Sequence, residues 1–214
     1  MNISEIFVAL QGEGRFQGTP VLFIRTSGCT RACSWCDTKY HTEGKEISIV
    51  ELKSTIKRIV CTGTTTVVWT GGEPLMQLKE ILEVMKRLPT DIKWHLETNG
   101  DLITDDHVYR TLSKHFNYIA ISPKCLKTGS AVYNLRQRYV PNNEDALVDI
   151  KVVTDLEKIN TELVFFATSL MPYTTYNREV DDEVRKKVWM YCVEHNLHYS
   201  ARLHTLNFGN KRGV

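Results

Sequence analysis

The segment PVLFIRTSGCTRACSWCDT, residues 20–38, joins an apolar, β-branched run that ends at Gly28 to a loop rich in cysteine. The apolar run is typical of a short buried strand. The loop holds three of the six cysteines of the chain, Cys29, Cys33 and Cys36, in the spacing C-x₃-C-x₂-C. The segment therefore predicts a strand whose carboxyl end carries a group of thiols.

Strand-like and helix-like segments alternate along most of the chain. Apolar residues at helical spacing predict helices at 48–60, at 77–88, from near Thr104, and at 181–195. The segment 126–143 has the least pattern and is expected to be a loop or a short irregular insertion. Further strands are expected at 64–70, 92–100, 118–124, 146–153, 162–170 and 198–204.

This alternation predicts an α/β fold with a mostly parallel sheet, closed or partly closed into a barrel. The sequence shows no internal repeat and no low-complexity linker, so residues 1–214 are expected to form a single domain.

Composition excludes several classes of protein. The formal net charge is +2, so no strong basic field indicates nucleic-acid binding. No run of about 18 apolar residues is present, and a membrane-spanning helix is therefore not expected. The stretch MNISEIFVALQGEG (1–14) lacks the basic start and apolar run of a signal peptide. A cytoplasmic location is expected, where cysteines stay reduced and a close group of them more often binds metal than forms disulfides.

Polar, turn-rich segments follow four of the expected strands. They are the cysteine loop, GGEP (71–74), ETNG (97–100) and SPK (122–124). In parallel α/β folds the carboxyl ends of the strands lie along one edge, where functional residues gather. These segments are therefore expected to converge on one site.

Three cysteines at short spacing suit two kinds of metal centre. A four-iron cluster held by three thiolates keeps one iron without a protein ligand, free to bind a small molecule. A zinc site completed by His41 or by a distant residue is the alternative, because structural zinc takes four ligands. The cysteines alone leave both open.

The neighbouring motifs resemble those of the radical S-adenosylmethionine superfamily. The cysteine spacing after an early strand, Trp35 just before the third cysteine, and GGEP about 35 residues later form a joint pattern. The resemblance implies that a [4Fe-4S] cluster chelates the methionine moiety of S-adenosylmethionine, and that the Gly-Gly-Glu segment meets the same moiety through its backbone.

The N-terminal block is more specific, and it resembles the 7-carboxy-7-deazaguanine synthase family. The block consists of LQGEG (10–14), Gly18, Pro20, FIR (23–25), the cysteine loop and CDT (36–38). The likeness continues through ETNG, SPK and the ending 203–214.

The resemblance implies a radical lyase that converts 6-carboxy-5,6,7,8-tetrahydropterin to 7-carboxy-7-deazaguanine with release of ammonia, in queuosine-type 7-deazapurine biosynthesis. It also implies a partial TIM-like barrel of about six strands with few flanking helices, Mg²⁺, a flavodoxin- or ferredoxin-like electron donor and a homodimer. The single radical S-adenosylmethionine core domain would carry short substrate-binding segments at its two ends.

The family roles transfer residue by residue, as implications of the resemblance. Cluster ligation falls to Cys29, Cys33 and Cys36, and magnesium binding falls to Thr38. Substrate binding falls to Leu10, Gln11, Gly12, Glu13, Arg25, Thr70 and Val214. Catalytic roles fall to Glu13, Arg25 and His204. Contacts with S-adenosylmethionine fall to Trp35, Cys36, Asp37, Gly72, Glu97, Ser122, Pro123 and Lys124.

Two other functions compete with this interpretation. A glycyl-radical activating enzyme has similar size and cysteine spacing, but it has no use for a pterin pocket at Gln11, Glu13 and Arg25. A non-enzymatic zinc-binding module is the other alternative, and it predicts a colourless protein that holds one zinc ion.

Overall fold

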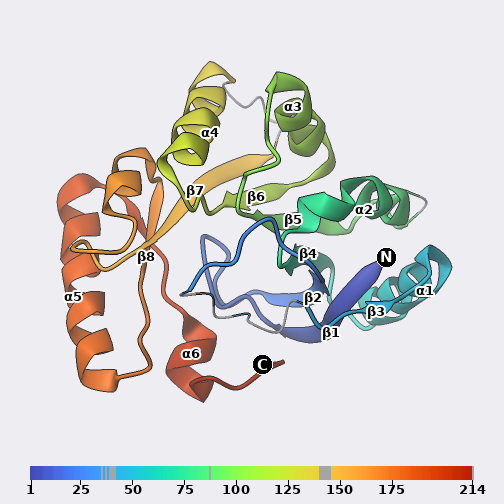
Figure 1. Cartoon of the computed structure of the whole chain (residues 1–214). Helices are drawn as coiled ribbons and strands as arrows, with labels where there is room; N and C mark the ends of the chain where they lie inside the picture. The colour runs from blue at the N-terminus through green and yellow to red at the C-terminus, as the bar shows by residue number, and fades with distance from the viewer. Residues whose placement is uncertain (35, 37, 39–41, 87, 140–145, 214) are drawn as a thin grey trace.

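The computed structural model of the chain describes residues 1–214 except 35, 37, 39–41, 87, 140–145 and 214 (Figure 1). Within the described residues, nine strands form one sheet in the order β3-β1-β2-β4-β5-β6-β7-β8-β9. The strands are β1 (Asn2–Leu10), β2 (Pro20–Thr26), β3 (Lys45–Glu46), β4 (Thr66–Gly71), β5 (Lys93–Thr98), β6 (Tyr118–Ile121), β7 (Leu147–Thr154), β8 (Ser169–Pro172) and β9 (His198–Tyr199).

The pairing is mostly parallel. Strand β1 runs antiparallel to both β2 and β3, whereas every neighbouring pair from β2 to β9 is parallel. Strands β3 and β9 stand at opposite ends of the order, so the described sheet is open. The predicted α/β class with a mostly parallel, partial barrel is therefore confirmed.

Most helices lie around the outside of the curved sheet, whereas the last one lies at its open side (Figure 1). Those expected from sequence are present, and Ser48 and Asp105 cap α1 and α3 by accepting from Glu51 N and Val108 N. No helix in the described ranges is long and apolar enough to cross a bilayer. The helices are α1 (Ile49–Val60), α2 (Leu78–Met85), α3 (Asp106–His115), α4 (Leu126–Arg138), α5 (Arg178–His195) and α6 (Leu203–Phe208), with 3₁₀ helices η1 (Pro74–Gln77) and η2 (Thr161–Phe166).

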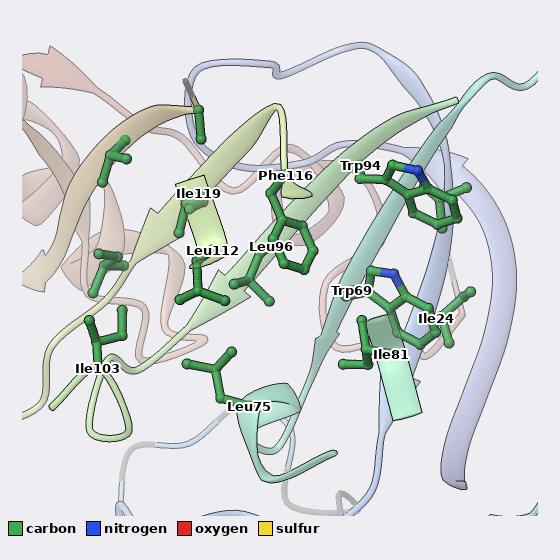
Figure 2. Packing of buried hydrophobic residues seen from close by; sticks show 14 of the residues in the cluster. Ile24, Trp69, Leu75, Ile81, Trp94, Leu96, Ile103, Leu112, Phe116 and Ile119 are labelled. Carbon is green, nitrogen blue, oxygen red and sulfur yellow. The ribbon is translucent and has the colours of Figure 1, made fainter. Parts of the chain in front are cut away.

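The main core lies between the sheet and these outer helices (Figure 2). Trp69 of β4 and Trp94 of β5 stack with ring centroids 6.5 Å apart. Ile81 of α2 is fully buried in the same cluster. Because the outward face of the sheet is covered in this way, its inward face is left to hold polar groups.

The expectation of a loop at 126–143 is wrong for residues 126–138, which form α4, and residues 140–143 lie outside the described residues. The buried face of α4 consists of Thr128, Gly129, Val132 and Leu135, at helical spacing. Gly129 packs against Leu163 and Phe166, where a side chain would collide. The apolar stripe was inconspicuous in the sequence because small and polar residues make up half of it.

The expected strand at 162–170 is wrong over its first half. Residues 161–166 form the 3₁₀ helix η2, and β8 begins only at Ser169. Leu163 is fully buried while Phe165 is exposed, although the two would share one face of a strand. Asn160, in the left-handed region at φ 52°, starts the helix.

The expected strand at 198–204 is also too long. Strand β9 covers only His198–Tyr199, and α6 begins at Leu203. The chain leaves the sheet because Ser200 Oγ accepts from Gly14 N at 2.7 Å and Leu203 N donates to Gly12 O at 2.9 Å. Conversely, residues 2–10 form strand β1, although no strand was expected there.

Candidate active site

One pocket of about 260 Å³ lies against the carboxyl ends of the parallel strands. Its wall includes residues from all four polar segments that the sequence placed at one edge. Strands β7 and β8 and the C-terminal segment 202–213 complete the wall. The predicted site residues in the wall are Leu10, Gln11, Gly12, Glu13, Arg25, Cys29, Cys33, Cys36, Thr38, Thr70, Gly72, Glu97, Ser122, Lys124 and His204.

One predicted site residue that the structure describes does not line this wall, and others fall outside the described residues. Pro123 lies between two lining residues but does not itself line the pocket. Trp35, Asp37 and Val214 lie outside the described residues, as does His41, the alternative zinc ligand.

The three thiols of the cysteine loop are partly buried. Asn99 Nδ2 lies 3.9 Å from Cys29 Sγ. Within the part of the chain that the structure describes, no three His, Cys, Asp or Glu side chains are grouped to hold a single metal ion. Cluster ligands need no such grouping, since each thiolate binds a different iron atom. Three thiols at one end of an open pocket therefore fit a [4Fe-4S] cluster with one accessible corner.

Gly72 lets the loop after β4 lie directly on the cysteine loop. A Cβ at this position would overlap the carbonyl oxygen of Gly28, and Glu73 N donates to that same oxygen at 2.8 Å. Gly71 is at φ 143°, which disfavours any residue with a side chain. The glycines are thus required by contact between two loops of the protein as well as by any ligand above them.

Glu73 joins three loops from a fully buried position. Its carboxylate accepts from Thr98 Oγ1 at 2.7 Å, Asn99 N at 2.7 Å and Leu75 N at 3.0 Å. Burial raises the pKa of this carboxyl, against the opposing effect of those hydrogen bonds. Glu73 therefore holds the GGEP and ETNG segments in register and is not directed at the pocket.

The predicted substrate residues form a connected network. Glu97 accepts from Gln11 Nε2 and from Thr70 Oγ1, each at 3.0 Å. Gln11 Oε1 in turn accepts from Glu13 N at 3.2 Å. Glu97, expected beside S-adenosylmethionine, thus has residues of the pterin side as its partners.

Glu13 lies between two cations that the sequence analysis did not select. Lys151 Nζ is 2.5 Å from Glu13 Oε2, and Arg202 Nε is 3.6 Å from Oε1. Burial by itself would raise the pKa of the Glu13 carboxyl, but the charges of Lys151 and Arg202 outweigh it and lower that pKa far below its ordinary value. Glu13 is therefore a carboxylate at neutral pH.

Lys151 carried a signal that the sequence analysis did not use. It stands two residues after Asp149 inside the apolar run of β7, and both side chains are buried. Charged residues in a buried strand are rare unless they are paired. Since alternate residues share a face, both had to point away from the helix-covered side. Arg202 had no comparable local signal.

Arg25 joins the predicted magnesium ligand to the N-terminal strand. Its Nη1 donates to Thr38 Oγ1 at 3.3 Å, and its Nε donates to Glu5 Oε2 at 3.0 Å. Glu5 also pairs with Arg212 of the C-terminal segment. The guanidinium is thereby fixed from two sides in the pocket wall.

His204 is placed by a glycine. A Cβ on Gly12 would overlap His204 Nδ1, so the imidazole occupies the space that the missing side chain leaves. His204 lies in the first turn of α6, at the open side of the sheet (Figure 1). Segments near the two ends of the chain therefore meet at the pocket.

The sequence matches a known superfamily. The Radical SAM superfamily model matches residues 23–166, from the strand before the cysteine loop to the end of η2. The chain therefore belongs to the radical S-adenosylmethionine superfamily, whose members use a [4Fe-4S] cluster and S-adenosylmethionine.

Within that superfamily, the chain is similar in sequence to members of one family. The chain is 34% identical over 162 residues to a 7-carboxy-7-deazaguanine synthase of Thermoplasma acidophilum, covering 73% of each chain. It is 29% identical over 226 residues to the one of Pyrobaculum aerophilum, covering 100% of this chain and 97% of that one. The chain belongs to the 7-carboxy-7-deazaguanine synthase family.

The solved structures confirm the fold. QueE from Escherichia coli has a TM-score of 0.54 at 20% identity, covering 95% of this chain and 94% of that one. Streptococcus suis SuiB, crystallised with the precursor peptide SuiA, has a TM-score of 0.52 at 15% identity, covering 87% of this chain and 50% of that one. With the family established, the chain is a radical S-adenosylmethionine lyase of 7-deazapurine biosynthesis, and the zinc-module and activase alternatives are set aside.

Proposed function

We propose that this chain converts 6-carboxy-5,6,7,8-tetrahydropterin to 7-carboxy-7-deazaguanine with release of ammonia. One observation supports this choice above others. The cysteine loop and the trio Gln11, Glu13 and Arg25 line the same pocket. A pocket that joins a radical-generating centre to a carboxylate and a guanidinium suits a substrate with a guanidine-like edge and a carboxylate.

The protein groups have separable tasks in this proposal. Cys29, Cys33 and Cys36 hold the cluster, which together with S-adenosylmethionine supplies the radical chemistry when bound. Gly72 and the Ser122–Lys124 segment contact S-adenosylmethionine; Lys124 Nζ donates to Ser122 Oγ at 3.0 Å. Glu13, kept ionised, accepts from the two N–H groups of the pterin edge. Gln11 and Thr70 fix Glu97 beside that edge.

Arg25 and Thr38 account for the substrate carboxylate and for Mg²⁺. Thr38 is buried in the pocket wall, and its hydroxyl is a hard oxygen donor of the kind Mg²⁺ prefers. With Arg25 Nη1 only 3.3 Å from that hydroxyl, two cations would adjoin each other there. A substrate carboxylate between them offsets this repulsion, so metal and substrate should bind together.

The radical chemistry requires a one-electron donor, and the proposed donor is of the flavodoxin or ferredoxin type. The proposed assembly is a homodimer, as in the family. The proposed catalytic residues are Glu13, Arg25 and His204.

An anaerobic turnover assay tests the proposal. Reconstituted protein would be given S-adenosylmethionine, a strong reductant, Mg²⁺ and 6-carboxy-tetrahydropterin, and products would be followed by mass spectrometry. We expect 7-carboxy-7-deazaguanine in yield equal to the ammonia released, and a lower rate when Mg²⁺ is chelated.

The variant Glu13→Gln is the matched control. It should abolish pterin turnover while the cluster absorbance and the S-adenosylmethionine affinity stay unchanged, since Glu13 pairs with Lys151 and Arg202 on the substrate side. If the wild type makes 5′-deoxyadenosine but no deazapurine, the superfamily assignment survives and the substrate assignment is wrong.

A further inference from the structure

Lys151 is a buried cation without a role in the reaction described so far. It lies in β7 with its residue 5% exposed, and its side chain faces the pocket. Its Nζ donates to Glu13 Oε2 at 2.5 Å, across 138 residues of sequence. A buried ammonium is costly unless paired, so its presence at this depth needs an explanation.

The contact leaves part of the Glu13 carboxylate available. A carboxylate offers about four lone-pair sites over two oxygens. Lys151 takes one site on Oε2, while Arg202 approaches Oε1 at the longer distance of 3.6 Å. Both cations come from strand β7 and the segment before α6, which form one side of the pocket. Lys151 and Arg202 therefore occupy only part of this carboxylate, and its other lone-pair sites can accept from a ligand.

We propose that Lys151 is a positioning residue for the substrate: its ammonium fixes the orientation and the ionised form of Glu13 for pterin binding. The inference rests on the proposed function, since it assigns Lys151 to that substrate site. Lys151 need not touch the substrate. It acts through Glu13, whose carboxylate must accept two N–H donors and can do so only when it carries no proton.

The charges around Glu13 support this assignment. The titratable groups facing it are Lys151 of β7 and, from the C-terminal segment, Arg202 and His204. The neighbouring carboxylate is Glu97 of β5, which favours the charged form of Lys151. Burial opposes the ionised form of Glu13, and Lys151 is the largest effect acting against it. Removing the ammonium therefore leaves burial opposed only by the weaker neighbours.

An ion pair that served only stability would show the same contact between Lys151 and Glu13. The two roles differ in what they predict for Glu13 itself. A structural pair affects stability, whereas a positioning pair also sets the proton affinity of Glu13 and the pH dependence of substrate binding. The test must therefore measure those two quantities.

The first measurement is the titration of Glu13 in reconstituted protein labelled with ¹³C at the glutamate carboxyl groups. Loss of one signal in Glu13→Gln assigns the resonance. In the wild type we expect Glu13 to stay ionised down to the lowest pH at which the protein is folded. In Lys151→Met its pKa should rise above the ordinary 4.5. In Lys151→Arg, which keeps the charge, it should stay low.

The second measurement is the KM for 6-carboxy-tetrahydropterin at pH 6 and pH 8. We expect the KM at pH 6 divided by the KM at pH 8 to be higher in Lys151→Met than in wild type, with kcat and the KM for S-adenosylmethionine changed little. Lys151→Arg should restore most of the wild-type ratio. Arg15→Met, which breaks another buried ion pair, with Asp149, serves as the control for lost stability.

The outcomes separate the two proposals. A Glu13 pKa in Lys151→Met that stays as low as in the wild type overturns the role of Lys151, whether or not the enzyme turns over pterin. If Arg15→Met shows the same KM ratio as Lys151→Met, the effect is one of stability and the inference is again wrong. If the wild type makes no deazapurine while the titration shifts as expected, the proposed function fails and the control of Glu13 by Lys151 stands.

Discussion

Gly72 shows how one missing methyl group determines the site. Its Cα faces the carbonyl oxygen of Gly28, and the atoms that an added Cβ would meet include backbone, which has little freedom to move aside. The same contact places Cys29, the first thiol of the cysteine loop, next to the loop after β4. Packing between the two loops therefore requires a glycine at this position, whether or not a ligand is bound.

We expect Gly72→Ala to cost on the order of 3–5 kcal/mol and to lower the iron bound per chain, because the two loops must separate. Iron content and the thermal midpoint after anaerobic reconstitution would measure this. Gly63→Ala is the control: φ there is 109°, with nothing within 4 Å of the added Cβ, so the cost is limited to backbone strain. Full iron content in Gly72→Ala would contradict the packing argument.

At the scale of elements, a clamp ties the cysteine loop to two other loops. Arg31 donates to Asp101 with Nε at 2.5 Å and Nη2 at 2.7 Å. Asp101, after β5, also accepts from Thr128 Oγ1 of α4 at 2.7 Å, and Arg31 Nη2 lies 3.1 Å from Cys125 Sγ. A bidentate pair of this kind restrains direction as well as distance. The clamp therefore fixes the position of the cysteine loop relative to the loops after β5 and β6.

Asp101→Ala should release the cysteine loop while leaving the sheet intact. We expect a several-fold faster loss of cluster absorbance on exposure to air, and a loss of stability of about 1–2 kcal/mol, since the pair is only partly buried. Arg138→Ala, which removes an exposed pair with Asp106, should change neither quantity appreciably. Equal rates of cluster loss in wild type and Asp101→Ala would refute the clamp.

At the scale of the whole molecule, a buried ion pair fastens the N-terminal loop to the far half of the sheet. Arg15 donates to both Asp149 oxygens, at 2.9 and 2.8 Å, and Tyr118 and Thr168 donate to the same carboxylate. The Asp149 side chain is 2% exposed, against 30% for Arg15. Burial would raise the pKa of Asp149, but Arg15 outweighs it and lowers that pKa.

Because the folded pKa of Asp149 is depressed, its stabilising contribution is present above the unfolded value of 3.8 and is lost as pH falls through the folded pKa. Arg15→Met should therefore cost about 2–3 kcal/mol at pH 7, at the low end for a buried pair because Arg15 is partly exposed. The difference from wild type should stay constant down to about pH 4 and should shrink as the pH is lowered further, below 3.8. Thermal midpoints measured above and below that value test this, and a difference that stays constant throughout would contradict it.

Secondary structure was predictable where a face was apolar and failed where it was not. The helix at 77–88 was found because five large apolar residues repeat at helical spacing. Helix α4 was missed because Thr128 and Gly129 take the places of large residues on its buried face. The apolar run at 162–166 was taken for a strand, since a short run carries no period that separates strand from helix.

The sequence by itself determined the parallel α/β class, the thiol spacing and the loops that carry the site. These follow from local patterns, because burial on one face fixes a period and glycine permits close backbone contact. Only the tertiary structure decided that Lys151 faces Glu13, that Arg15 meets Asp149 and that His204 fills the space beside Gly12. The first two pairs lie 138 and 134 residues apart. The physical reason is that any partner of opposite charge makes a buried charge tolerable. The local sequence therefore shows that a partner is needed. Which residue that partner is depends on how the curved sheet brings distant segments together.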